Sequence, residues 1–146
     1  MTFLYQPAYC EENVWHLCTD PRFDDREPQA VFISNARRAA PVWHQRAAPP
    51  GEPVVWDYHV VLLARAAAAW EVWDLDTTLG LPVSALRYAS EALAAGRLAP
   101  EWAQRLRVVA APEFVATFRS DRSHMRSPDG RWTAPPPPWN TIGGGG

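Results

Sequence analysis

A buried strand is predicted by the stretch VVWDYHVVLL at residues 54–63, which is rich in β-branched and apolar side chains. A second strand is predicted by WEVWDLD at residues 70–76, where apolar and polar side chains alternate. We expect the two strands to form an antiparallel hairpin that turns between Ala66 and Ala67. This register gives three facing pairs: Leu63 with Trp70, Val61 with Val72, and His59 with Asp74.

The predicted hairpin makes His59 and Asp74 neighbours. Facing side chains of an antiparallel pair share one face of the sheet, with Cβ atoms roughly 5 Å apart. A carboxylate at that distance orients an imidazole and favours its charged form. The loop from Arg65 to Ala69 has no Gly or Asn, so no tight turn is signalled, and a slip of one residue would separate the pair.

A helix is predicted to begin at Cys10, in the run YCEENVW at residues 9–15. Val14, Leu17 and Cys18 follow at helical spacing, and Glu11 and Glu12 would complement the helix dipole in the first turn. The positive end of a helix favours a thiolate, which is the nucleophilic form of cysteine. The alternative is a small buried side chain without chemistry, which is the usual fate of a free cysteine.

Cys10, His59 and Asp74 together are the candidate catalytic set, because the chain order Cys, His, Asp suits a thiol hydrolase. The alternatives for the latter two are a structural histidine within a strand and an aspartate that ends one. The other histidines, His16, His44 and His124, give no zinc-ligand spacing with a cysteine. Cys10 and Cys18 would lie about 12 Å apart on one helix, too far for a disulfide. We therefore expect neither a metal site nor a disulfide.

The chain closely resembles the protein N-terminal glutamine amidohydrolase family in blocks that follow the family's order. The six matching blocks are YCEEN (9–13), VFISN (31–35), WDYHVVL (56–62), DLDT (74–77), SDRSHM (120–125) and PPPP (135–138). The resemblance implies an α/β (α+β) fold with a papain- or transglutaminase-like cysteine hydrolase core, in which helices flank a mainly antiparallel sheet. It also implies that an N-terminal glutamine of a protein or peptide is deamidated to glutamate, with release of ammonia. By position, the family's catalytic residues fall on Cys10, His59 and Asp74.

The expected chemistry passes through a thioester on Cys10 and requires no metal or organic cofactor. The backbone N–H of Cys10 is one expected donor to the oxyanion. Specificity for a terminal glutamine requires a pocket with acceptors for the α-amino group. The candidates are carboxylates within two residues of the set: Glu11, Glu12, Asp57 and Asp76. Trp56 is the expected pocket wall.

Three alternative functions remain open from the residues alone. A transglutaminase would pass the same thioester to an amine, and a cysteine protease would cleave the peptide backbone. A binding module for N-terminal degradation signals would not need Cys10. Detection of ammonia and glutamate, rather than an amine adduct or a shorter peptide, distinguishes the amidohydrolase from these alternatives.

Composition indicates one cytoplasmic catalytic domain at residues 1–142, followed by a flexible glycine tail at 143–146. The 146 residues are 47% hydrophobic and 21% charged, which is ordinary for a globular domain. No apolar stretch reaches transmembrane length, no signal-peptide pattern begins the chain, and two cysteines suit a reducing compartment. The net charge of −2 and the scattered arginines give no nucleic-acid footprint. We expect a monomer that binds no membrane. The sequence pattern of the family continues beyond residue 146 with an apolar segment. The resemblance therefore implies that the C-terminus is truncated or that the chain is a short variant.

The remaining elements are predicted from local patterns and turn residues. A helix over 84–95, ended by Gly96, would turn Leu86, Ala89 and Leu93 inward. We expect strands at 30–34, 41–45 and 106–110, helices from Pro100 to Arg105 and from Pro112 to Phe118, and a packed extended segment at Pro135 to Pro138.

Overall fold

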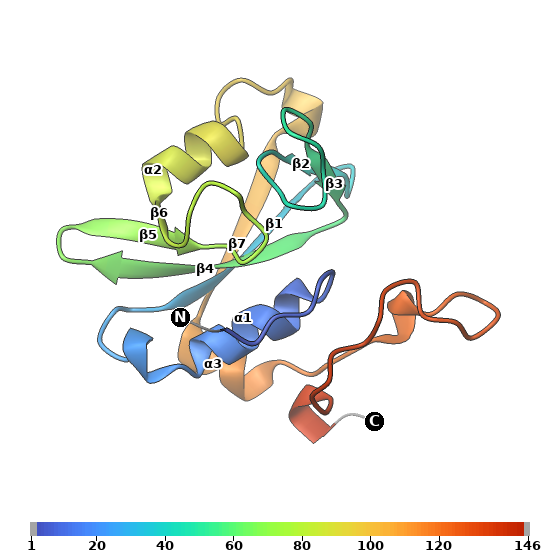
Figure 1. Cartoon of the computed structure of the whole chain (residues 1–146). Coiled ribbons are helices and arrows are strands. Elements are labelled where there is room, and N and C mark those ends of the chain that lie inside the picture. The colour runs from blue at the N-terminus through green and yellow to red at the C-terminus, as the bar shows by residue number, and fades with distance from the viewer. Residues whose placement is uncertain (1–2, 145–146) are drawn as a thin grey trace.

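An antiparallel sheet forms the centre of the computed structural model, which describes residues 3–144 (Figure 1). The strands are Gln29–Asn35 (β1), Ala40–Val42 (β2), Val54–Trp56 (β3), His59–Ala66 (β4), Ala69–Trp73 (β5), Val83–Ser84 (β6) and Gln104–Ala110 (β7). The central sheet has the order β6-β5-β4-β1-β7, and β2 pairs with β3 separately. Each of these pairings is antiparallel, which confirms the mixed α/β class with a mainly antiparallel sheet.

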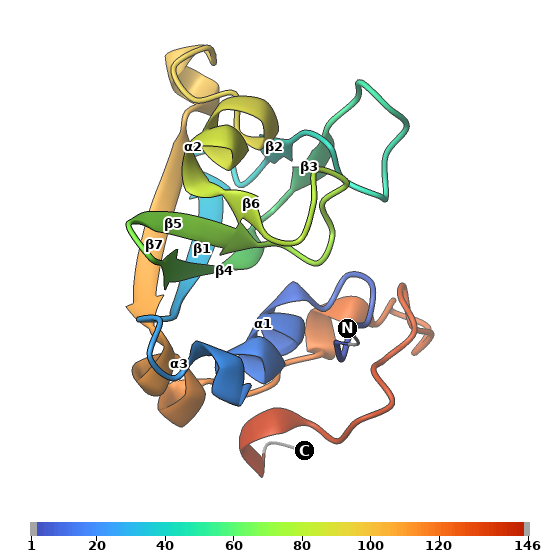
Figure 2. The ribbon, with the colours of Figure 1, turned by 60° about the vertical axis from the view of Figure 1, so that its left-hand side comes forward.

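Helices cover both faces of the central sheet. They are Cys10–Cys18 (α1), Ala85–Arg87 (α2), which runs on into a π-helical turn at Tyr88–Ala92, and Ala111–Thr117 (α3). Short 3-10 turns lie at Pro21–Phe23, Pro100–Trp102, Ser123–Met125 and Ile142–Gly144. Figures 1 and 2 show α1 and α3 against one face of the sheet and α2 against the other. None of the helices within residues 3–144 is long and apolar enough to span a membrane.

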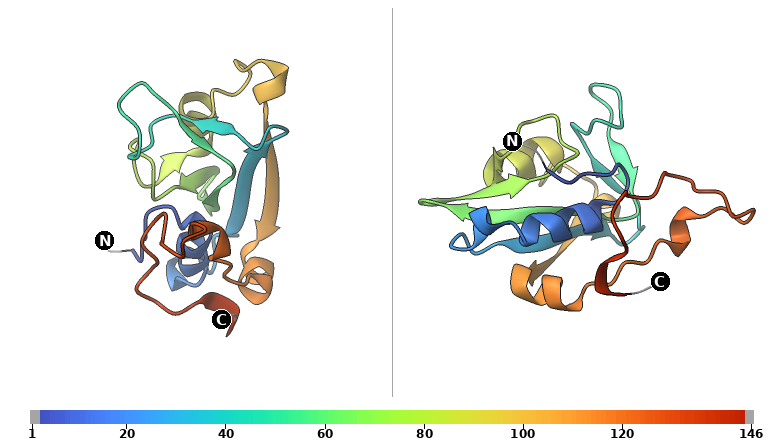
Figure 3. Two further views of the ribbon diagram at one scale, coloured as in Figure 1. Left: turned by 90° about the vertical axis from the view of Figure 1, so that its right-hand side faces the viewer. Right: turned by 60° about the horizontal axis from the view of Figure 1, so that its bottom comes forward.

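The alternation of side chains along β4 builds a core on each face of the sheet. On one face, Val60 and Leu62 belong to the cluster that contains Val14 and Leu17 of α1. On the other face, Val61 packs in a cluster with residues of β1, β5, β6 and the turn after α2. Burying one such aliphatic side chain contributes about 1.5–3 kcal/mol, so β4 fixes both layers. Its contact with α1, which runs alongside it in Figure 3, brings the start of the helix to the sheet.

The β4–β5 hairpin exists, but the predicted register was wrong. Leu63 pairs with Val72 rather than Trp70, and the two-residue turn is Ala67 and Ala68. Ala67 has a φ of 48°, so an alanine, rather than the glycine that would have signalled a tight turn, occupies the left-handed conformation. The register differs from the prediction by two residues. Because side chains alternate with a period of two, each residue keeps the face of the sheet that was predicted for it.

The predicted strand at 54–63 is in fact two strands in different sheets. Val54–Trp56 pairs with β2, whereas His59–Ala66 pairs with β1 and β5. At the break, the carboxylate of Asp57 accepts a 2.9 Å hydrogen bond from the backbone N–H of Tyr58. An aspartate that bonds to the neighbouring backbone interrupts a strand ladder, and the chain changes sheet at this point.

The predicted helix over 84–95 is also shorter than expected. Ser84 caps it by accepting a hydrogen bond from the N–H of Arg87, but α-helical geometry ends there and a wider π turn follows. The wider turn changes which side chains face inward. Leu86 is 86% exposed, contrary to the prediction, while Tyr88 is buried in its place.

The other predicted elements have close counterparts in the structure. Strands β1 and β7 and helices α1 and α3 lie within one or two residues of their predicted bounds. The segment 41–45 contributes only its first part to β2, and the helix expected after Pro100 is a single 3-10 turn. Within the predicted glycine tail, Gly143 and Gly144 belong to the turn at Ile142–Gly144, and residues 145 and 146 lie outside the described residues.

The segment 119–144, which we call the C-terminal strap, passes around the beginning of α1 (Figures 2 and 3). Gln6 donates a hydrogen bond to the carbonyl of Pro135 at 3.0 Å, and the Tyr9 hydroxyl donates to that of Ala134 at 3.1 Å. The strap therefore rests on the residues that lead into α1.

Candidate active site

Cys10 is the first residue of α1 and lines a surface cleft. Its relative exposure is 7%. Asn13 holds the approach to the helix in place, because its side chain accepts from the N–H of Gln6 at 2.9 Å and donates to the carbonyl of Gln6 at 3.0 Å. The first N–H groups of a helix have no partner within it, so the backbone N–H of Cys10 is available to a ligand. The cleft is lined by Ala8, Tyr9, Cys10, Glu11, Glu12, Tyr58, Phe118, Asp121 and His124.

His59 and Asp74 form a fully enclosed pair. The Nε2 atom of His59 lies 3.0 Å from Oδ1 of Asp74, and the two side chains have relative exposures of 0% and 1%. Asp74 follows the end of β5 and lies beside the first residue of β4. The structure thus brings the two residues together, although they are not facing partners in the hairpin register.

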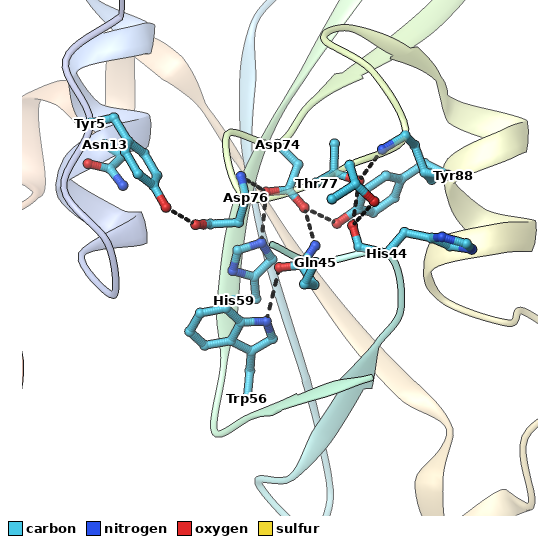
Figure 4. A network of polar contacts seen from close by, with 12 residues as sticks. Tyr5, Asn13, His44, Gln45, Trp56, His59, Asp74, Asp76, Thr77 and Tyr88 are labelled. Carbon is cyan, nitrogen blue, oxygen red and sulfur yellow. Dashed lines mark hydrogen bonds and ion pairs between the residues drawn. The ribbon is translucent and has the colours of Figure 1, made fainter. Parts of the chain in front are cut away.

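The carboxylate of Asp74 is held by four hydrogen bonds (Figure 4). Its Oδ1 atom accepts from His59 and, at 2.9 Å, from the backbone N–H of Asp76. Its Oδ2 atom accepts from Gln45 at 3.0 Å and from the Tyr88 hydroxyl at 2.7 Å. Burial raises the pKa of Asp74, but His59, Tyr88 and Gln45 outweigh burial, so the pKa is lowered and the carboxylate stays charged.

The imidazole of His59 is favoured in its protonated form. Burial lowers the pKa of His59, but the charge and hydrogen bond of Asp74, joined by Cys10, raise it well above the ordinary value. The second ring nitrogen, Nδ1, is buried and has no hydrogen-bond partner among residues 3–144. Because Nε2 is held by Asp74, Nδ1 is the ring nitrogen that is free to exchange a proton with another group.

Trp56 covers His59 on one side. The two rings are stacked, with centroids 4.7 Å apart and an interplanar angle of 12°. The indole N–H of Trp56 donates to Gln45 at 3.3 Å, and Gln45 in turn donates to Asp74. Gln45 therefore joins the ring that covers the histidine to the carboxylate that orients it (Figure 4).

The segments around Gln45 and Asp76 are fastened to each other by their backbones. The N–H of Arg46 donates to the carbonyl of Asp76 at 2.9 Å, and the N–H of Thr78 donates to the carbonyl of His44 at 2.7 Å.

Sequence patterns did not indicate Gln45, Tyr88 or Tyr5 as site residues. The available signal was that a buried tyrosine hydroxyl requires a partner, which would have applied to Tyr88 in the predicted helix.

The four predicted acceptor carboxylates have different surroundings. Glu12 is 4% exposed and forms a two-pronged ion pair with Arg122, at 2.7 and 3.0 Å, and also accepts from Trp139. Asp57 is exposed at the break between β3 and β4. Glu11 accepts a hydrogen bond from the Tyr58 hydroxyl inside the cleft of Cys10. Asp76 is 7% exposed and accepts from the Tyr5 hydroxyl.

One cluster among the described residues brings together side chains that could hold a metal ion. One ligand atom from each of His59, Asp74 and Asp76 lies within 4.8 Å of the others. Nε2 of His59 and both oxygens of Asp74 already take part in hydrogen bonds with protein groups, as does Oδ1 of Asp76. Most of the atoms in this cluster that could bind a metal ion therefore already have a hydrogen-bond partner in the protein.

The amino-acid sequence that forms this site matches a known protein family. Residues 5–146 match the model of the N-terminal glutamine amidase family. The human protein N-terminal glutamine amidohydrolase is 41% identical over 145 residues, covering 95% of this chain and 71% of the human protein. The zebrafish (Danio rerio) protein of that name is 42% identical, covering 95% and 72%, and the Arabidopsis thaliana one is 40% identical, covering 96% and 68%. The chain therefore belongs to the N-terminal glutamine amidase family, whose matched members are amidohydrolases.

Proposed function

We propose that this protein deamidates the side chain of an N-terminal glutamine in proteins or peptides, with Cys10 as the nucleophile. The observation that carries this mechanism is the divided role of the two nitrogens of His59. Nε2 is fixed on a charged carboxylate, whereas Nδ1 is buried without a partner among the described residues. The matched relatives bear the name of this activity. A nucleophile that exchanges a proton with an oriented histidine is the general arrangement of a catalytic triad.

The first half of the reaction forms a thioester. The Cys10 thiolate attacks the side-chain carbonyl carbon of glutamine, and the carbonyl oxygen takes up the negative charge. The backbone N–H of Cys10 at the start of α1 stabilises this oxyanion. The oxyanion then re-forms the carbonyl, the C–N bond breaks, and His59 gives its proton to the departing ammonia.

The second half hydrolyses the thioester. His59, now neutral, takes a proton from water while the oxygen of that water bonds to the thioester carbon. The carbon–sulfur bond breaks, glutamate leaves, and the pair of Cys10 thiolate and His59 imidazolium is restored. Asp74 stabilises the imidazolium in both halves through its 3.0 Å contact with Nε2.

We further propose that residues 1–142 act as one catalytic domain with a papain- or transglutaminase-like core. The support is a cysteine at the start of a helix that packs on an antiparallel strand, whose first residue is the histidine. We propose that the enzyme works as a cytoplasmic monomer on protein or peptide substrates rather than on nucleic acid. The two unpaired thiols are compatible with a reducing compartment.

The test is incubation of the protein with a peptide that begins with glutamine, in water enriched in ¹⁸O and with a primary amine present. Hydrolysis releases ammonia and leaves one ¹⁸O atom in the new glutamate, which mass spectrometry detects. Incorporation of the amine would instead indicate transglutaminase chemistry, and a shorter peptide would indicate proteolysis. Either of these outcomes, or the absence of ammonia, would overturn the proposed function.

A further inference from the structure

Asp76 is a second carboxylate at the catalytic centre, and the steps above make no use of it. It is 93% buried, since its relative exposure is 7%. Its backbone is fixed on both sides, because its N–H donates to Asp74 at 2.9 Å and its carbonyl accepts from the N–H of Arg46 at 2.9 Å. The position of Asp76 relative to His59 is therefore set by the same network that orients the histidine.

Only half of the Asp76 carboxylate is occupied. Oδ1 accepts a hydrogen bond from the Tyr5 hydroxyl, as Figure 4 shows, and no other hydrogen bond or ion pair reaches the carboxylate from residues 3–144. Burial raises the pKa of Asp76, and the charges of His59 and Arg46 oppose this rise. The Arg46 guanidinium lies over the Tyr5 ring at 4.8 Å. The second carboxylate oxygen therefore has no donor among residues 3–144 and remains available to a ligand that enters beside Asp76.

The carboxylate opens on a hollow beside the cleft of Cys10. Asp76 lines this hollow with Tyr5, Pro7, Ala8, Arg46, Ala47, Val54 and Trp56. Ala8 also lines the cleft that contains Cys10, so the two hollows adjoin across the residues that lead into α1. A substrate bound at Cys10 thus has a neighbouring space with two aromatic residues, Tyr5 and the half-buried Trp56, one acidic group and the basic Arg46.

The separation suits a single glutamine residue. Four bonds join the side-chain carbonyl carbon of glutamine to its α-nitrogen, a reach of roughly 5 Å in an extended conformation. Asp76 has a carboxylate oxygen within 4.8 Å of a ring nitrogen of His59, the residue that serves Cys10. The length of one glutamine side chain is therefore similar to the distance between Asp76 and the histidine that serves Cys10.

We propose that Asp76 accepts a hydrogen bond from the charged α-amino group of the substrate, with Trp56 as the wall beside it, and so selects an N-terminal glutamine over an internal one. This assignment rests on the proposed function. The carboxylate oxygen that Tyr5 leaves unoccupied receives the donor that the protein does not provide, and the substrate's positive charge balances the buried negative one.

The other three predicted acceptors fit the role less well. Glu12 already has Arg122 and Trp139 as partners. Asp57 is exposed, so its bond to a substrate cation would be weakened by water. Glu11 is the nearest competitor, because it lies in the cleft and has only Tyr58 as a side-chain hydrogen-bond partner within the described chain.

The decisive experiment removes the amino group from the substrate and the carboxylate from the enzyme, separately and together. Two peptides differ only at their first residue, which is glutamine or its desamino analogue glutaramoyl. Wild-type kcat/KM should fall about ten- to a hundredfold on loss of the amino group, as expected for a charge-assisted hydrogen bond. In Asp76→Asn the two peptides should differ by less than about threefold, which is within the range of an ordinary neutral hydrogen bond. Exposed Asp25→Asn serves as the matched control and should keep the wild-type ratio.

The outcomes separate the two proposals. A wild-type ratio retained in Asp76→Asn, or abolished by Glu11→Gln instead, would overturn the assignment and leave the deamidation intact. An equal loss on both peptides in Asp76→Asn would also overturn it, because Asp76 would then act on His59. If Asp76→Asn fails to fold, Asp76→Glu keeps the charge but displaces it, and an unchanged ratio there would overturn the assignment. Wild-type protein that releases no ammonia from the glutamine peptide would overturn the proposed function itself.

Discussion

The Nε2 atom of His59 lies 3.0 Å from Oδ1 of Asp74, with both side chains closed to solvent. The carboxylate does not depend on the histidine for its position, because Gln45, Tyr88 and the N–H of Asp76 also donate to it. The Nε2 atom of the histidine, by contrast, is held by Asp74 alone among residues 3–144. Asp74 is thus the fixed member of the pair and His59 the oriented one.

Replacing Asp74 by Asn should lower kcat by roughly 10³–10⁴-fold, the order of magnitude found when the orienting aspartate of a triad is removed. An amide in this position no longer stabilises the imidazolium and favours the wrong ring tautomer. Steady-state ammonia release from a glutamine peptide measures the effect. Tyr88→Phe, which removes one of the four bonds to Asp74, should cost far less. Equal losses in the two variants would show that Asp74 has only a packing role.

Cys18 should take no part in the reaction. Burial raises the pKa of its thiol to about 12, so almost none of it is thiolate at neutral pH. We expect Cys18→Ala to keep wild-type activity, and a limiting dose of iodoacetamide to inactivate the protein through Cys10. Peptide mapping of the alkylated protein identifies the modified residue. Inactivation that follows modification of Cys18, with Cys10 still free, would contradict this expectation.

The ion pair between Glu12 and Arg122 should be a main attachment of the C-terminal strap. Their side chains are 5% and 14% exposed, and Arg122→Ala would leave Glu12 buried with the neutral donors Trp139 and Ser120 and no positive charge in contact. Removing one partner of a buried pair destabilises a protein by about 3–5 kcal/mol. Urea unfolding measures this change. Arg131→Ala, which breaks the exposed pair with Asp129, is the control and should cost about 0–1 kcal/mol.

The turn of the β4–β5 hairpin should be improved by glycine at one position. Ala67 has a φ of 48°, which costs a non-glycine residue roughly 1–2 kcal/mol. We expect Ala67→Gly to raise the melting temperature. Ala68→Gly is the matched control, because Ala68 does not share the positive φ and the substitution should be neutral or destabilising. A lower melting temperature for Ala67→Gly would refute the expectation.

Much of the local structure could be predicted from periodicity. The helix at Cys10–Cys18 follows from the apolar spacing behind its acidic first turn, and β4 follows from its β-branched run. The prediction that His59 and Asp74 lie close together was correct, although the register from which it was made was wrong. The error of two residues kept both side chains on the expected face, and Asp74, just beyond the end of β5, reaches His59 diagonally.

The parts that sequence reasoning missed depend on contacts between distant segments. Gln45 and Tyr5 reach the site from loops that are fixed by contacts with segments far away in the chain. Tyr88 faces Asp74 because a π turn replaces the expected α-helix, a change of phase that no residue in 84–95 signals. The break after Trp56 requires a local bond of Asp57 that competes with the strand ladder.

The proposed reaction depends on Cys10 as the nucleophile. The most direct measurement compares wild type with Cys10→Ala, each shown to be folded by circular dichroism, for ammonia release from one peptide that begins with glutamine. We predict release by the wild type, with a mass increase of about one unit on the peptide, and only the uncatalysed background from Cys10→Ala. A folded Cys10→Ala protein that deamidates the peptide at the wild-type rate would contradict the account.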